Sequence, residues 1–171
     1  MKWVALLRAV NLGGRNKVPM AELRAKLEDA GYGNVRTYIA SGNVLLDGPA
    51  RRKTLGSELE RLVLDAFGVT TTVILRKPKE LAETVDAHPF SDPSETHVAF
   101  LAARPGKAAA ERLEAFATDA VLASAELYLR LPRGVQGSRL SNTRIESLLG
   151  VPATLRNWRT VVALAELAAG A

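Results

Sequence analysis

The sequence has no cysteine and only two histidines, His88 and His97, among its 171 residues. These absences exclude disulfide bonds, thiolate metal sites and cysteine nucleophiles, and two imidazoles are too few for an ordinary zinc site. A long apolar run is also missing, because Arg8 ends the N-terminal run Trp3–Leu7 well short of a signal peptide or a membrane span. We therefore expect a cytoplasmic protein with no metal, no cofactor and no membrane anchor.

Residue patterns typical of catalysis are missing as well. There is no Ser-His-Asp grouping and no close pair of acidic residues, and His88 beside Pro89 is interpreted as a loop residue rather than a general base. The sequence therefore does not identify any catalytic residue. The sequence indicates more about the fold than about the function.

The composition is that of a folded globular protein, with 47% hydrophobic and 24% charged residues in a length that suits one domain or two small ones. The net charge of +5 is unevenly distributed: residues 1–46 carry seven Lys/Arg and three Asp/Glu, residues 47–128 carry ten and thirteen, and residues 129–171 carry six and two. Genomic base composition explains the preference for arginine but not this segregation. The basic end segments therefore suggest a surface that faces an anion.

Apolar periodicity in residues 1–77 predicts the order strand, helix, strand, strand, helix, strand. Pro19 marks the beginning of the first helix and Gly68 the end of the second. The expected strands are Lys2–Val10, Val35–Ala40, Val44–Asp47 and Thr70–Arg76, and the helices carry the apolar stripes Met20, Leu23, Leu27, Ala30 and Leu55, Leu59, Leu62, Val63, Phe67. This βαββαβ order is that of a ferredoxin-like unit.

A second, similar pattern follows a connecting segment. Val98–Leu101 is similar in sequence to Val4–Leu7, which hints at an internal duplication. The further elements expected are a helix at Pro78–Ala87, a helix from Lys107 to about Asp119, strands at Glu126–Leu131 and Val135–Leu140, a helix at Asn142–Leu149, and a final helix with Val161, Leu164 and Leu167 apolar. We predict an α+β fold of duplicated ferredoxin-like halves, with antiparallel sheets and helices on one face. The predicted divisions are residues 1–77, a connecting helix and linker at 78–94, and residues 95–171.

Three polar clusters are candidates for binding. The first follows the first strand and contains Arg8, Asn11, Gly13, Gly14, Arg15, Asn16 and Lys17. A glycine loop before a helix lets backbone amides converge on an anion, although neither the Walker loop nor the dinucleotide-binding spacing is present. The alternative is a tight turn in which the glycines supply positive φ and the asparagines bond the backbone.

The second cluster, Ser41, Gly42 and Asn43, joins two strands, and the same residues make good hairpin turns for purely local reasons. The third cluster contains Arg139, Arg144, Arg156, Asn157, Trp158, Arg159 and Thr160. Arginine is a planar bidentate donor for phosphate or carboxylate, and Trp158 offers a face for a base or a cation. Structural roles compete here too: Thr143 with Glu146 fits a capping box, Asn157 fits an N-cap, and Trp158 fits a partly buried packing position.

The stretches LLRAVNLGGRNKVPMAEL (6–23), YIASGNV (38–44) and TLRNWRTV (154–161) resemble, in this order, family 1697 of the domains of unknown function, which are small uncharacterised bacterial proteins. The resemblance implies the duplicated ferredoxin-like fold and no established activity. It places the family's polar signature on Arg8, Asn11, Gly13, Gly14, Asn16, Lys17, Ser41, Gly42, Asn43, Arg139, Arg156, Asn157, Trp158 and Thr160. The chain departs from the pattern at Ala9 (usually Gly), Arg139 (usually Lys), Leu155 (usually Thr) and Ala163 (usually Lys), and the last two argue against ligand roles there.

The leading hypothesis is a binding protein for an anionic ligand, either a phosphate-containing small molecule or a nucleic acid. A first alternative is an enzyme acting on a phosphorylated or acyl-phosphate substrate, because Gly134-Val-Gln-Gly followed by a helix and Arg156-Asn157 looks like the acylphosphatase order. The Phe-Arg that should end that loop is absent. A second alternative is a protein interaction module whose polar motifs are turns and caps. The sequence does not distinguish RNA from DNA, and it leaves the oligomeric state open.

Overall fold

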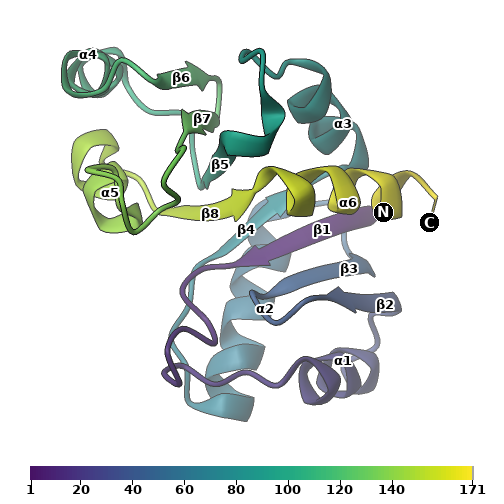
Figure 1. The fold of residues 1–171 in the computed structure, drawn as a ribbon. Coiled ribbons are helices and arrows are strands. Elements are labelled where there is room, and N and C mark those ends of the chain that lie inside the picture. The colour runs from purple at the N-terminus through teal and green to yellow at the C-terminus, as the bar shows by residue number, and fades with distance from the viewer. Residues whose placement is uncertain (171) are drawn as a thin grey trace. The chain divides into compact units, whose positions relative to one another are not determined.

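The structure, a computed structural model that describes residues 1–170, divides into two compact units (Figure 1). Unit 1 comprises Met1–Leu81 and the residues from Glu166 onward, and unit 2 comprises Ala82–Ala165. Two helices, α3 (Pro78–Asp86) and α6 (Trp158–Ala169), contribute residues to both units. None of the helices in residues 1–170 combines the length and the apolarity needed to cross a membrane.

Unit 1 contains a four-stranded antiparallel sheet with the strand order β2-β3-β1-β4. Its elements are β1 (Lys2–Leu7), α1 (Met20–Asp29), β2 (Gly33–Tyr38), β3 (Asn43–Asp47), α2 (Arg52–Phe67) and β4 (Val73–Arg76). Trp3, Ala5 and Leu7 alternate along β1 and pack with the apolar stripes of α1 and α2 in one cluster. The helices therefore cover one face of this sheet, as period-two strands and period-3.6 helices require.

The helices of unit 1 begin and end largely where their residues indicate. In α2, Leu55, Leu59 and Val63 are buried, and Gly68 ends the helix with φ 66° and its N–H donating to the Leu64 carbonyl. Pro19 occupies the N-cap of α1 rather than the first helical position that the sequence suggested. Its ψ of 125° is extended, so the helix begins one residue later, at Met20.

Unit 2 contains a second four-stranded antiparallel sheet, with the strand order β6-β7-β5-β8. Its elements are η1 (Pro93–Glu95), β5 (Thr96–Leu101), α4 (Lys107–Phe116), β6 (Ala120–Ala123), β7 (Glu126–Arg130), α5 (Asn142–Leu149) and β8 (Ala153–Asn157). Leu113 of α4 and Ile145 of α5 pack with Ala99 and Leu127 of the sheet. Two antiparallel sheets and six helices among the described residues confirm the predicted α+β class.

For residues 95–171, one predicted strand is wrong and two strands, β6 and β8, were not predicted. The segment predicted as the strand Val135–Leu140 consists of turns, because Gly134 has φ 72° and Ser138 N donates to the Val135 carbonyl. The last strand of unit 2 is instead β8, where Ala153, Thr154 and Arg156 are buried. The edge strand β6 was not predicted at all, since its four small or aliphatic residues show neither alternation nor deep burial.

The capping box predicted for Thr143 and Glu146 is also wrong. Ser141 is the N-cap of α5, and its Oγ accepts from the Arg144 N–H at 3.2 Å. The Glu146 carboxylate accepts from the Asn142 side chain at 3.0 Å and from the Ala153 N–H at 3.2 Å. Glu146 therefore ties the beginning of β8 to α5 instead of closing the first turn of the helix.

Gly42 supplies a test of the packing between β1 and the β2–β3 hairpin. It has φ 89°, and an added Cβ would lie 2.6 Å from Val10 Cγ2 and 2.9 Å from Leu7 Cβ. We expect Gly42→Ala to lower the free energy of unfolding by about 3 kcal/mol, combining backbone strain and overpacking. Gly68→Ala is the matched control, because Gly68 also has positive φ but nothing within 4 Å. Urea denaturation should show a clearly smaller loss for the control; equal losses would contradict the packing argument.

Candidate functional site

The first two polar clusters come together in unit 1, in two neighbouring loops. We call residues 8–18 the basic loop and residues 39–42 the hairpin turn. The Asn11 side chain joins them, because its Nδ2 donates to the Val18 carbonyl at 2.9 Å and to the Ala40 carbonyl at 2.7 Å. Its Oδ1 accepts from the Val18 N–H at 2.8 Å. Asn11 thus satisfies backbone groups of both loops and fixes their relative position.

The backbone of these loops is strained at several residues that are not glycine. Ala9, Asn11 and Asn16 of the basic loop have φ of 56°, 54° and 51°, and Ile39 of the hairpin turn has φ of 50°. Asparagine tolerates this region, but alanine does so at a cost and a β-branched residue is a clear outlier. Hydrogen bonds hold the strain in place: Asn16 Nδ2 donates to the Ala9 carbonyl at 3.0 Å, and Thr71 Oγ1 donates to the Arg8 carbonyl at 2.7 Å.

The glycines of the basic loop form a turn with the conformation that the tight-turn alternative requires. Gly13 and Gly14 have φ of 56° and 77°, and Arg15 N donates to the Leu12 carbonyl at 2.9 Å. The side chains of Arg15 and Lys17 are exposed, and neither forms an ion pair with an acidic residue of 1–170. The basic loop therefore contains both a tight turn and two exposed positive charges, so the turn does not exclude anion binding there.

Ser41 and Asn43 act within the hairpin. Asn43 is fully buried, and its Nδ2 donates to the Tyr38 carbonyl at 2.9 Å and to Ser41 Oγ at 3.0 Å. The neighbouring Gly42 carbonyl accepts from the Leu7 N–H at 2.8 Å. These contacts connect the turn to β1, so the polar residues of the second cluster stabilise the fold locally.

Arg156 of the third cluster is buried in unit 2, where it is 6% exposed. Its Nη1 donates to Thr154 Oγ1 at 2.7 Å and to the Leu155 carbonyl at 2.8 Å. Burial lowers the pKa of its guanidinium to about 10, because the charged form is poorly solvated there. The fold itself therefore uses this side chain.

The residues after Arg156 divide between capping and packing. Asn157 caps α6, since its Oδ1 accepts from the Thr160 N–H at 2.9 Å, and this confirms the N-cap prediction. Thr160 is buried, and half-buried Trp158 lies against the His88 ring with a centroid separation of 4.4 Å. The same histidine ring contacts Tyr128, whose pKa is raised to about 12, mainly by burial and secondarily by Glu126. Trp158 therefore packs within unit 2.

Arg139 and Arg144 are the exposed arginines that the structure brings together. The guanidinium carbons lie 4.8 Å and 5.2 Å from the centroid of the Phe116 ring at the end of α4. Neither side chain pairs with a carboxylate among the described residues. We call these two residues the arginine pair. Sequence reasoning did not single out Phe116, because it lies more than twenty positions before Arg139 and nothing local connects them.

Within residues 1–170, no group of three His, Asp or Glu side chains could hold a metal ion. Burial lowers the pKa of His97, and its Nδ1 is buried without a hydrogen-bond partner. Both observations favour the neutral imidazole at neutral pH.

The two neighbouring arginines Arg156 and Arg159 should respond differently to truncation. We expect Arg156→Ala to lower the free energy of unfolding by about 3 kcal/mol, because it removes buried hydrogen bonds and leaves a cavity. Exposed Arg159→Ala should change it by about 0.5 kcal/mol or less. Arg156→Met, which fills the space without a charge, should recover part of the loss. Chemical denaturation checks all three, and a fully stable Arg156→Ala variant would contradict the structural role.

Comparison with solved structures shows a similar fold in a protein of known structure. The conserved bacterial protein SP0830 from Streptococcus pneumoniae matches with a TM-score of 0.70 and 20% sequence identity, over 98% of each chain. At this identity the similarity concerns the fold alone. No curated protein matches the chain.

The family comparison agrees with the resemblance of the first two sequence stretches, 6–23 and 38–44, whereas the third, 154–161, lies outside the matched residues. The model of the family described as protein of unknown function, DUF1697, matches residues 1–128, which include both loops of unit 1 and the part of unit 2 that precedes β7. The match covers well over half of the chain, and this protein therefore belongs to the DUF1697 family.

Proposed function

We propose that this protein binds a phosphate-rich polyanion, with single-stranded nucleic acid as the ligand class that the geometry favours. The observation that carries the proposal is the arginine pair on Phe116. Two guanidinium groups lie within 5.2 Å of one ring centroid and have no carboxylate partner in residues 1–170. A protein gains nothing for its own stability by gathering like charges in this way, apart from the contact of each with the ring.

The electrostatics of the arginine pair suit a bridging anion. Cation–π contacts at exposed sites contribute about 0.5–1 kcal/mol each, which offsets the repulsion between two solvated charges. Each guanidinium still presents its remaining N–H donors in a planar fork that matches phosphate oxygens. Arg144 also lies in the first turn of α5, where the helix dipole adds partial positive charge.

The exposure of the arginine pair favours an extended ligand over a small enclosed one. Both side chains are exposed, so an anion bound there is contacted from one side only. A chain of phosphodiesters compensates for such weak single contacts by making several of them. Phe116, which is half-buried under the two guanidinium groups, adds an aromatic edge to the same surface.

A second basic surface in unit 1 supports the same ligand chemistry. Arg15 and Lys17 of the basic loop are exposed and have no ion-pair partner among the described residues. The strain at Ala9 supports a functional role for this loop, since costly backbone conformations persist at ligand-binding segments when surrounding bonds enforce them. The acyl-phosphate alternative gains no such support, because Arg156 is buried and Asn157 is engaged as a helix cap.

We also propose that the two units are ferredoxin-like halves of duplicated origin. In both units the chain passes through β-α-β-β-α-β, and the strands take the same relative order, second-third-first-fourth. These parallels support two ferredoxin-like halves of duplicated origin, residues 1–77 and 95–171, with α3 and the linker between them at 78–94. A duplicated unit gives a natural reason for basic surfaces in both end segments.

The nucleic-acid proposal predicts a defined loss on removing the arginine pair. We expect the Arg139→Ala/Arg144→Ala variant to bind a labelled mixed-sequence single-stranded RNA at least tenfold more weakly, as measured by fluorescence anisotropy at low salt. The slope of log K against log salt should become shallower by about 1.4, because two phosphate contacts are lost at about 0.7 each. Phe116→Leu should weaken RNA binding less than the double variant does, because both arginine charges remain and only the aromatic ring beneath them is lost.

The matched control is Arg104→Ala/Lys107→Ala, which removes two exposed positive charges from the same unit without touching the arginine pair. It should bind almost as well as the unaltered protein. Equal losses in both double variants would indicate net charge alone, and absence of RNA and DNA binding at low salt would refute the proposal. If a small phosphate compound binds without this steep salt dependence, the ligand is a small anion and not a nucleic acid.

A second candidate function, protein interaction, is favoured by exposed apolar side chains on the basic loop and the hairpin turn of unit 1. Leu12 is 60% exposed and Ile39 is 50% exposed, although Ile39 also holds a φ of 50°. We expect Ile39→Asn to raise the free energy of unfolding by about 1 kcal/mol, because asparagine adopts this backbone conformation more easily. A chemical denaturation curve measures this. A destabilised variant would show that the Ile39 side chain serves the fold rather than an exposed contact.

A further inference from the structure

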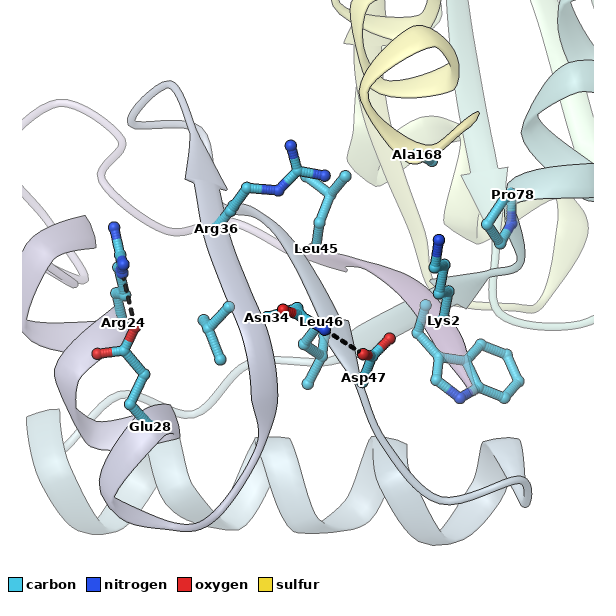
Figure 2. Close-up of a pocket in the computed structure, with 12 residues that line it drawn as sticks. Lys2, Arg24, Glu28, Asn34, Arg36, Leu45, Leu46, Asp47, Pro78 and Ala168 are labelled. Carbon is cyan, nitrogen blue, oxygen red and sulfur yellow. Dashed lines mark hydrogen bonds and ion pairs between the residues drawn. The ribbon is translucent and has the colours of Figure 1, made fainter. Parts of the chain in front are cut away.

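A pocket of about 460 Å³ lies in unit 1, at the edge of the sheet formed by β2 (Figure 2). This volume falls within the range of small-molecule sites. The pocket is lined by residues of β1, β2, β3 and α1, together with Pro78 and Ala168. None of the polar clusters discussed above contributes to it, so it is a separate feature of the unit.

An irregularity in β2 shapes the pocket. The register between β2 and β3 shifts between Gly33 and Arg36, and Asn34 in this bulge has φ of 50°. Its Nδ2 donates to Asp47 Oδ2 at 2.6 Å, so the bulge holds the carboxylate in one orientation (Figure 2). Bulges of this kind redirect side chains, and they are frequent beside binding sites.

Apolar side chains form the inner part of the pocket. Val35, Leu45 and Leu46 all line it and are buried, but Val35 and Leu46 pack in the core cluster on the helix-covered face of the sheet, so Leu45 is the one of the three on the same face as Asp47. Arg24 and Glu28 lie at one side and satisfy each other through a 2.8 Å ion pair. Lys2, Arg36 and Asp47 are the charged residues of the lining that form no ion pair within residues 1–170.

The strand register places these three polar residues on the same face of the sheet. Lys2 pairs directly with Asp47, and Arg36 pairs directly with Leu45, two residues along the same strand. Directly opposed residues of antiparallel strands point to the same side, with their Cα atoms about 5 Å apart. In Figure 2 the Lys2 and Arg36 side chains both extend toward the side where Ala168 lies.

Each of the three groups retains bonding capacity. Arg36 donates one N–H to the Leu167 carbonyl at 3.0 Å, which leaves its other donors available. Lys2 is exposed and forms no ion pair within residues 1–170. Asp47 uses Oδ2 for Asn34, and its Oδ1 has no hydrogen bond in the described part of the chain.

We propose that this pocket binds a free α-amino acid with an apolar side chain. Lys2 and Arg36 bind the carboxylate, the free Oδ1 of Asp47 binds the ammonium group, and the side chain packs against Leu45. A zwitterion suits the pocket because cationic and anionic groups lie on the same face of the sheet as the apolar side chain of Leu45. A simple anion would meet the Asp47 carboxylate, and a simple cation would meet Lys2 and Arg36.

Isothermal titration calorimetry of the full-length protein with individual amino acids tests the proposal. We expect leucine, methionine or phenylalanine to bind. The matching carboxylic acid that lacks the amine, and the matching amine that lacks the carboxylate, should each bind at least tenfold more weakly. Asp47→Asn should weaken amino-acid binding at least tenfold, because the charge is lost while the amide oxygen can still accept from Asn34. Lys2→Met should also weaken amino-acid binding, because it removes a contact with the ligand carboxylate.

The charge-matched control is Asp29→Asn, at the exposed end of α1 and outside the pocket, which should bind as the unaltered protein does. Circular dichroism and melting temperature confirm that each variant is folded. Absence of heat with every amino acid overturns the proposal, and so does binding of the deaminated acid as tightly as the amino acid. Neither result bears on the arginine pair, because the two tests use different ligands and different residues.

Discussion

The burial of β1 on both faces is the constraint on which the organisation of unit 1 depends. Trp3, Ala5 and Leu7 face the helices, while Val4 and Leu6 point the other way and are fully buried too. A strand enclosed on both faces and paired on both edges has no freedom to slip in register. The basic loop therefore begins at a fixed point, where Leu7 and Arg8 bond the Gly42 and Thr72 carbonyls.

Several basic residues of this protein differ in environment. Arg156 is enclosed and supports the fold through its neighbours, and Arg36 holds a carbonyl near the end of α6. Arg15, Lys17 and the arginine pair remain exposed without acidic partners among the described residues. A net charge alone cannot make this distinction, because it weighs a buried guanidinium and a displayed one equally.

Much of the fold could be predicted from the sequence, wherever the signal is local and strong. The apolar stripe Leu55, Leu59, Val63 marks α2, and the helix Asn142–Leu149 was predicted with the bounds that the structure shows. The edge strand β6 escaped prediction because its short AVLA segment, in which no residue is fully buried, carries no periodicity. The candidate site was harder, since the burial of Arg156 and the approach of Phe116 to Arg139 arise from contacts between distant segments.

The environments of Arg156 and Tyr128 have a consequence for proton exchange in alkaline solution. The pKa of Arg156 is lowered to about 10 in the folded protein, so unfolding at higher pH returns a proton to this guanidinium. The pKa of Tyr128 is raised to about 12, so unfolding in the same range releases a proton from the phenol. One group takes up what the other gives off. Between about pH 10 and 12 the two linkages have opposite signs, and the alkaline response of unit 2 is balanced at these two residues.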